Sequence, residues 1–175
     1  MDFSKNVILV TGHRRENHGE GIHNLCKALQ LISNSHVECE IVFPVHLNPA
    51  VLGPVQKHLG KIKNIHLAEP LDYTDFIYLM SKSYLVISDS GGIQEEAPSL
   101  GKPVLVTRET TERPEAVAAG TVELVGTNTK KIVSTTLSLF EDRQKYIQMS
   151  SSLNPYGDGR ASERILKILK DVHKD

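Results

Sequence analysis

Residues 84–96 read Y-L-V-I-S-D-S-G-G-I-Q-E-E and contain the pattern on which the fold prediction rests. Its first five residues, 84–88, form an apolar run of the kind found in strands that are buried on both faces. Two glycines follow, and residues 95–100 are predicted to be helical, with Gly101 ending the helix. A strand that runs through a glycine turn into a helix is typical of a βαβ unit.

The same alternation extends along the whole chain on both sides of this stretch. Strands are predicted at 6–11, 40–45, 65–68, 84–88, 103–106 and 121–125, with helical patterns between them. The turn cluster at 154–159 precedes a terminal helix from about 160 to 172. We therefore expect an α/β fold, a doubly wound parallel six-stranded sheet of Rossmann-like type, in a single domain over 1–175.

Composition excludes several classes of protein. The chain has 175 residues, 20 Lys and Arg against 21 Asp and Glu, and a net charge of −1, which argues against nucleic-acid binding. No apolar run is long enough to span a membrane, and residues 1–6 do not have the form of a signal peptide. Cys26 and Cys39 are not in a zinc-like spacing, so we expect two buried free thiols in a reducing cytoplasm.

The loop after the fourth strand contains the clearest candidate for a phosphate site. Ser90, Gly91 and Gly92 stand between a strand end and a helix start, where backbone N–H groups can crowd toward an anion. The alternative is a tight turn in which Ser90 only caps the helix. Glu95 and Glu96 point about 100° apart on a helix. One is expected to accept from a ribose diol and the other to be solvated.

Three more loops at strand ends carry basic residues. The loop at 11–17 contains His13, Arg14 and Arg15, the loop at 107–115 contains Arg108 and Arg113, and His46 follows the second strand. Arginine forks match phosphate oxygens, and histidine carries a proton near neutral pH. Solvated charged loops are the alternative. His13, His18 and His23 are five residues apart and do not share a helical face, so no metal site is expected.

Several long motifs, in order, resemble the bacterial non-hydrolysing UDP-N-acetylglucosamine 2-epimerases. They are V-T-G-H-R-R-E-N at 10–17, P-V-H-L-N-P at 44–49, D-S-G-G-I-Q-E-E-A-P-S-L-G-K-P-V at 89–104, T-T-E-R-P-E-A at 110–116 and N-P-Y-G-D-G at 154–159. The resemblance implies the C-terminal, UDP-binding lobe of a two-lobed GT-B-like enzyme. It also implies an isomerase that interconverts UDP-N-acetylglucosamine and UDP-N-acetylmannosamine by eliminating UDP and adding it back.

The resemblance also implies roles for individual residues. Ser90, Gly91 and Gly92 would hold the diphosphate and Glu96 would accept from the ribose hydroxyls. His13 would stabilise or protonate the leaving UDP. By the same resemblance, Phe76 would border the uracil, and Arg113 and Arg108 would contact phosphate or sugar. Arg14 and His46 would contact a second, activating UDP-N-acetylglucosamine.

The acidic residues that handle the C2 proton in this family belong to the N-terminal lobe, which this chain lacks. We therefore expect the chain alone to bind UDP weakly and to epimerise little, with no cofactor and no metal. The expected partners are UDP, UDP-N-acetylglucosamine, the missing lobe and, as is common in the family, a second copy. Two alternatives stay open: the nucleotide-binding lobe of a GT-B glycosyltransferase, and a non-catalytic module that binds UDP-sugars.

Overall fold

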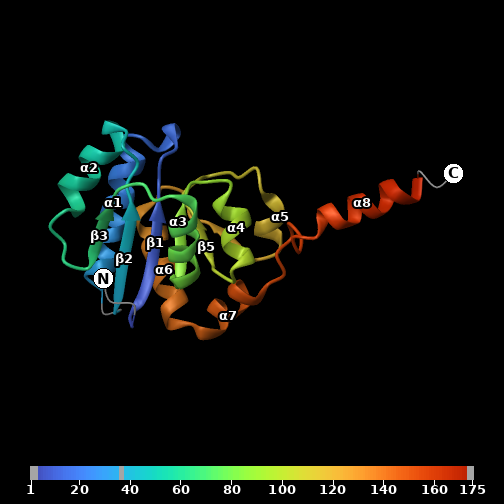
Figure 1. Cartoon of the computed structure of the whole chain (residues 1–175). Coiled ribbons are helices and arrows are strands. Elements are labelled where there is room, and N and C mark those ends of the chain that lie inside the picture. Colours follow the sequence, from blue (N-terminus) through green and yellow to red (C-terminus); the bar gives the residue numbers. More distant parts are fainter. Residues whose placement is uncertain (1–3, 36–37, 173–175) are drawn as a thin grey trace.

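A computed structural model describes residues 4–35 and 38–172 of the chain. Its centre is a six-stranded parallel sheet with the order β3-β2-β1-β4-β5-β6 (Figure 1). The strands are β1 (Asn6–Thr11), β2 (Cys39–Pro44), β3 (Ile65–Ala68), β4 (Leu85–Ser88), β5 (Val104–Val106) and β6 (Val122–Leu124). The predicted doubly wound parallel sheet is confirmed. The expected domain runs from residue 1 to residue 175, and both of its ends lie outside the described residues. Residues 1–3, part of the start that is not expected to be a signal peptide, also lie outside them.

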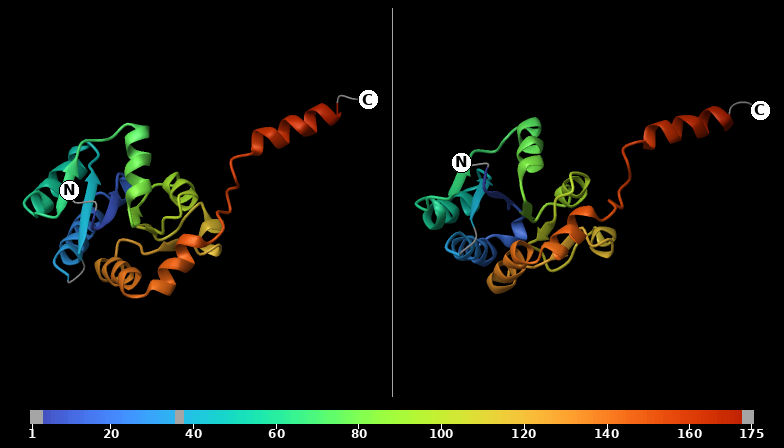
Figure 2. Two further views of the ribbon diagram at one scale, coloured as in Figure 1. Left: turned by 60° about the horizontal axis from the view of Figure 1, so that its bottom comes forward. Right: turned by 90° about the horizontal axis from the view of Figure 1, so that it is seen from below.

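Helices cover both faces of the sheet (Figure 2). One apolar cluster joins the sheet to α1 (Glu20–Ser33), α2 (Pro49–Leu59), α6 (Thr129–Glu141) and α7 (Arg143–Ser151). A second cluster joins it to α3 (Tyr73–Lys82), α4 (Ile93–Ser99) and α5 (Pro114–Ala118). Alternate strand residues serve the two clusters: Ile8 and Val10 belong to the first, Val7 and Leu9 to the second. This alternation explains why the strands read as continuous apolar runs.

The predicted elements differ from the observed ones mainly at their ends. The helix expected from Glu95 to Leu100 begins two residues earlier, at Ile93, and ends at Ser99. Gly101 adopts a φ of 66° directly after it, a conformation that favours glycine and stops the helix. The five-residue helix α5 was not predicted, although Pro114 at its first turn is a helix-start signal.

The predicted free thiols are confirmed. Cys26 and Cys39 are both free and buried. Burial raises the pKa of the Cys26 thiol to about 12 and that of Cys39, helped by the adjacent Glu40, to about 11. Both are therefore inert packing residues at neutral pH.

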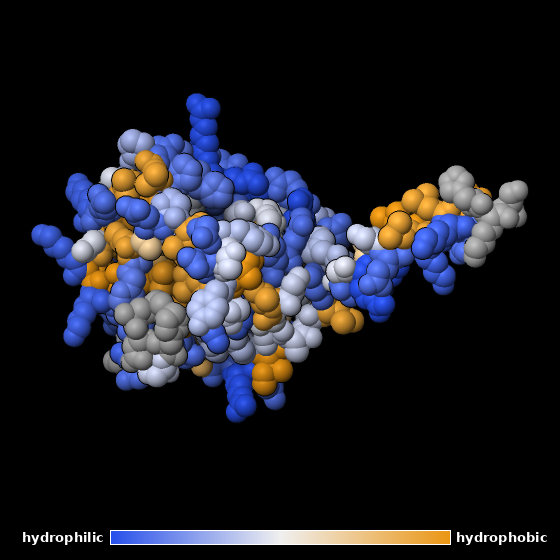
Figure 3. Space-filling model, viewed as in Figure 1, coloured by the Kyte–Doolittle hydropathy of each residue, from blue (hydrophilic) through white to orange (hydrophobic). Residues whose placement is uncertain are grey.

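The terminal helix α8 (Ala161–Val172) projects away from the rest of the molecule (Figure 1), close to its predicted bounds. None of its residues is buried, and its apolar side chains form an orange patch in Figure 3. These side chains are Ile165, Leu166, Ile168, Leu169 and Val172. Within the described part of the chain, no helix has the length and apolar character that crossing a bilayer requires.

Candidate functional site

The loops that follow β1, β4 and β5 are tied together at the carboxyl edge of the sheet by Asp89, which is fully buried. Its carboxylate accepts hydrogen bonds from the backbone N–H groups of His13, at 3.1 and 3.2 Å, and Arg14, at 2.8 Å. It also accepts from Asn17 Nδ2 at 3.0 Å, and the same amide donates to the Thr107 carbonyl at 3.2 Å. The three loops therefore form one junction.

The glycine turn lies open beside this junction. The Ser90 N–H donates to Ser88 Oγ at 3.0 Å, which fixes the start of the turn. Neither Gly91 nor Gly92 has a positive φ, so the glycines are not needed for backbone conformation. A Cβ on Gly91 would meet only Arg14 Nη2, at 3.8 Å. Because the first N–H groups of α4 also have no partner inside the helix, the turn can receive an anion next to an arginine.

A cavity of about 160 Å³ adjoins the same junction. It is lined by Thr11, Gly12, His13, Pro44, His46, Pro70, Leu71 and Phe76. The His13 and His46 rings stack with their centroids 6.0 Å apart and their planes 19° from parallel. The structure thus brings together His13, His46 and Phe76, which lie far apart in the sequence, around a slot of mixed apolar and imidazole character.

Arg108, for which a phosphate or sugar contact is expected, is held by two carboxylates. Its side chain is only 8% exposed, and it donates to Glu16 at 3.0 Å and to both oxygens of Glu112. The hydrogen bond with Arg108 is the main reason why the pKa of Glu112 falls to about 2. The positive charge of Arg108 is therefore already matched by two carboxylates, and its position favours a role in joining the loops.

Arg113 lies near α4, where its Nε donates to the carboxylate of Glu95. We expected one of the two adjacent glutamates to be solvated, and the Glu95 side chain is 38% exposed while it pairs with Arg113. The Arg113 backbone N–H donates to Thr111 Oγ1 at 3.0 Å, and that hydroxyl donates to Gln94 Oε1 at 2.5 Å. Arg113 is thus held at its backbone by Thr111 and at its side chain by Glu95, in the first turn of α4.

Glu96 is only partly exposed, and its pKa is raised by burial and, secondarily, by the neighbouring charge of Glu95. A carboxylate with this environment gains from any ligand that donates hydrogen bonds to it.

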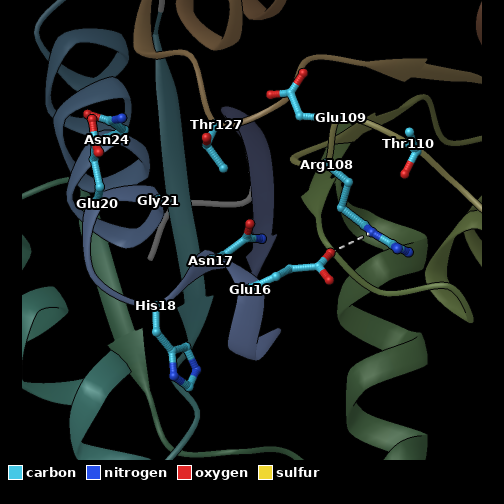
Figure 4. Close-up of a pocket in the computed structure, with 10 residues that line it drawn as sticks. All are labelled: Glu16, Asn17, His18, Glu20, Gly21, Asn24, Arg108, Glu109, Thr110 and Thr127. Carbon is cyan, nitrogen blue, oxygen red and sulfur yellow. Dashed lines mark hydrogen bonds and ion pairs between the residues drawn. The ribbon is translucent and has the colours of Figure 1, made fainter.

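A larger cavity of about 530 Å³ lies on the α1 side of the junction (Figure 4). It is lined by Glu16, Asn17, His18, Glu20, Gly21, Asn24, Arg108, Glu109, Thr110 and Thr127. Figure 4 shows Arg108 and Glu16 reaching toward each other across one end, while His18 points away. Of the candidate residues, only Arg108 lines it. No cluster of three or more His, Cys, Asp or Glu side chains that could hold a metal occurs in the described residues.

Sequence reasoning missed the residues that hold the site together, above all Asp89, Asn17, Glu16 and Glu112. A signal existed for Asp89, since it follows directly on a strand that is buried on both faces. A carboxylate at such a position needs several hydrogen-bond donors, and only the fold shows where they come from.

Comparison with known proteins places the chain in a family. The model of the family described as UDP-N-acetylglucosamine 2-epimerase matches residues 2–170. The chain belongs to this family. A UDP-N-acetylglucosamine 2-epimerase of Campylobacter jejuni is 59% identical over 169 residues, covering 97% of this chain and 44% of that protein.

Solved structures agree with this membership. The crystal structure of UDP-GlcNAc 2-epimerase from Neisseria meningitidis bound to UDP-GlcNAc superposes with a TM-score of 0.92 at 52% identity. That match covers 98% of this chain and 46% of the Neisseria chain. The calicheamicin glycosyltransferase CalG4, at 18% identity and a TM-score of 0.66, shares the fold alone, over 98% of this chain and 45% of its own. This chain therefore spans about half the length of the epimerases that it matches.

Proposed function

We propose that this chain is the UDP-binding half of a UDP-N-acetylglucosamine 2-epimerase, an isomerase that forms UDP-N-acetylmannosamine. The observation that carries the proposal is the open glycine turn at Gly91 and Gly92, with Arg14 beside it and Arg113 paired with Glu95 on the helix that follows. Similarity to the Neisseria epimerase, whose crystal structure contains UDP-GlcNAc, supports it.

In this proposal the diphosphate binds at Ser90, Gly91 and Gly92. Glu96, four residues after Gly92, accepts from the ribose hydroxyls, and the partly apolar slot near Phe76 borders the uracil. The volume of the slot, about 160 Å³, suits a flat ring and not a whole nucleotide. Arg113 supplies a cation to the phosphates or sugar from its position at Glu95.

The chemical step would break the anomeric C–O bond, and its electron pair passes to the departing diphosphate. N–H donors and cations that are already aimed at this group lower the barrier, because they need no rearrangement as charge develops. His13 would give a proton to the diphosphate oxygen as UDP leaves. The C2 proton is removed by a base, which the proposal assigns to the half that this chain lacks. Loss of a general base alone costs roughly 10²–10⁴-fold in rate, so we expect the chain by itself to bind UDP weakly and to turn over little.

The same proposal gives Arg14 and His46 a second UDP-N-acetylglucosamine as activator. Arg14 Nη2 lies over Gly91, and the His46 ring stacks on His13. Both groups are thus next to the first nucleotide site without being part of the glycine turn. Arg108 is left out of direct ligand contact, because its donors point at Glu16 and Glu112.

The uncovered face of α8 supports a protein partner. Single exposed apolar residues are ordinary, but five along one helix that packs on nothing are a contact surface. We assign this face to the half of the family polypeptide that this chain lacks, since the matched relatives are about twice as long.

The protein would act in the cytoplasm, which its buried free thiols fit, and as a dimer, as is common in the family.

The α8 assignment is tested by co-purifying the tagged chain with the unmatched half of the Campylobacter jejuni relative. The wild-type chain should retain that half, and a Leu166→Glu/Leu169→Glu variant should not, while both bind UDP equally. Retention by both chains would contradict the assignment.

The nucleotide site is tested by titrating the chain with UDP and following backbone amide shifts. We expect saturable changes in residues 88–97 and 11–16 and none in α8. Changes confined to other regions, or no saturable change at millimolar UDP, would overturn the proposal.

The glycosyltransferase alternative is separated by activity. A two-lobed protein carrying this chain, given UDP-N-acetylglucosamine without an acceptor, forms the mannosamine epimer only if it is an epimerase. A non-catalytic module would bind the same nucleotide and would not form the mannosamine epimer.

A further inference from the structure

The surroundings of His13 show how its side chain is held. Its ring stacks on His46 on one side, and its Nδ1 lies 3.5 Å from Asp89 Oδ1. The His13 side chain is 47% exposed, whereas the Asp89 side chain is not exposed at all. One face of the imidazole therefore reaches the site while its Nδ1 edge is turned toward a buried carboxylate.

Hydrogen-bond donors surround the buried Asp89 carboxylate. The backbone N–H groups of His13 and Arg14 and the Asn17 side-chain amide all point at its two oxygens. Three donors of this kind compensate the desolvation of a buried charge. Notably, all of them come from the loop that carries His13, so the same carboxylate fixes the backbone and faces the ring of that residue.

This arrangement determines which ring nitrogen carries the proton. In a neutral imidazole one nitrogen donates and the other accepts, and the neighbour of each nitrogen selects the tautomer. A carboxylate near Nδ1 selects the form with the proton on Nδ1. Nε2 is then left for the ligand, as an acceptor in the neutral ring and as a donor in the imidazolium form.

We propose that Asp89 is a positioning residue that orients His13 and holds its proton on Nδ1, so that Nε2 faces the leaving diphosphate. The role of the diphosphate rests on the proposed function, whereas the orientation of His13 does not. Asp89 itself is buried and touches no ligand.

The test uses the 175-residue chain with ¹⁵N-labelled histidine. In the free wild-type chain we expect the His13 imidazole nitrogens to show the Nδ1–H tautomer. In Asp89→Asn, the amide replaces one acceptor oxygen with a donor, so the tautomer should shift toward Nε2–H.

Asn17→Ala is the matched control, because it removes one tether of the loop but leaves the carboxylate in place. It should keep the Nδ1–H tautomer. An equal tautomer shift in Asn17→Ala would overturn the proposal, since loop anchoring alone would then explain the effect. An unchanged tautomer in folded Asp89→Asn would overturn it as well.

The spectrum of the wild-type chain tests the proposal even if Asp89→Asn does not fold. An Nε2–H tautomer of His13 in the wild-type chain would contradict the proposed orientation. Failure of UDP binding by the wild-type chain would instead refute the nucleotide site and leave the tautomer result standing.

Discussion

The guanidinium of Arg108 forms two hydrogen bonds with the carboxylate of Glu112, at 2.5 and 2.9 Å. Its third donor, Nε, reaches Glu16 in the loop after β1, at 3.0 Å. One buried cation therefore links the loop after β5 to the loop after β1. Because the fork geometry of arginine is used on a carboxylate, a lysine at this position would not replace it.

The Arg108–Glu112 pair predicts a pH-dependent stability. The hydrogen bond with Arg108 lowers the pKa of Glu112 from its ordinary 4.5 to about 2. A lowered carboxyl pKa contributes stability that is complete above the unfolded value and is lost as pH falls through the folded one. The free energy of unfolding of wild type should therefore exceed that of Glu112→Gln by a constant amount above about pH 4.5, and this difference should shrink toward pH 2.

Denaturant unfolding between pH 7 and 2.5 measures this difference. The control is the same comparison in an Arg108→Gln background, where the difference should be small and much flatter. A difference between wild type and Glu112→Gln that is independent of pH would show that the pair does not control the Glu112 carboxyl.

The fold was predictable from sequence because each strand is a local apolar run and each helix a local stripe. The loop at 11–17 illustrates the limit of this reasoning. Its His13 and Arg14 were recognised as anion-binding residue types, but their partners lie more than 70 residues away, in Asp89 and Glu112. Residue type indicates the chemistry that a loop can perform, whereas the pairing of charges across loops depends on sheet order.

The pair of Arg113 and Glu95 predicts non-additive effects on UDP binding. Arg113→Ala should weaken binding about tenfold, as expected for a lost charged contact. Glu95→Ala should weaken UDP binding by a smaller factor. Glu95 accepts from Arg113 Nε and so orients the guanidinium, whose other N–H groups are the ones proposed to bind UDP. In an Arg113→Ala background, Glu95→Ala should have almost no effect, since residues in contact couple.

Calorimetric titration of the four proteins with UDP completes this cycle. Independent, multiplicative losses would mean that Glu95 acts on the ligand by itself and not through Arg113.

A side chain at position 91 is expected to affect ligand binding but not the stability of the fold. The φ of Gly91 is not positive, and a Cβ would meet nothing closer than Arg14 Nη2 at 3.8 Å. Gly91→Ala should therefore leave stability unchanged or raise it by up to about 1 kcal/mol. UDP affinity should fall about tenfold or more, because the methyl group occupies the space over the turn.

Gly53→Ala is the matched control for this substitution, because Gly53 lies in α2 with nothing within 4 Å of its added Cβ. Because the added Cβ stands next to the Pro54 ring, which disfavours helical backbone in the preceding residue, no gain in stability is expected, and UDP binding should be unchanged. Equal UDP affinity in the Gly91→Ala and Gly53→Ala chains would place the diphosphate elsewhere.

Glu96 predicts opposite effects on stability and on binding. Burial, and secondarily the charge of Glu95, raise the pKa of Glu96 above 4.5. A carboxyl with a raised pKa holds its proton more tightly in the folded state, so its ionised form at neutral pH costs stability. Glu96→Gln should therefore be more stable than wild type at pH 7, and the difference should disappear as the pH falls below about 4.5.

The same variant should bind UDP about tenfold more weakly, because an amide offers one acceptor where the ribose diol needs two. Unfolding curves and UDP titrations of Glu96→Gln, with Glu163→Gln on α8 as the binding control, measure both effects. A variant that gains stability and keeps full UDP affinity would leave Glu96 without a role at the ribose, and a destabilised variant would show that its charge is satisfied within the fold.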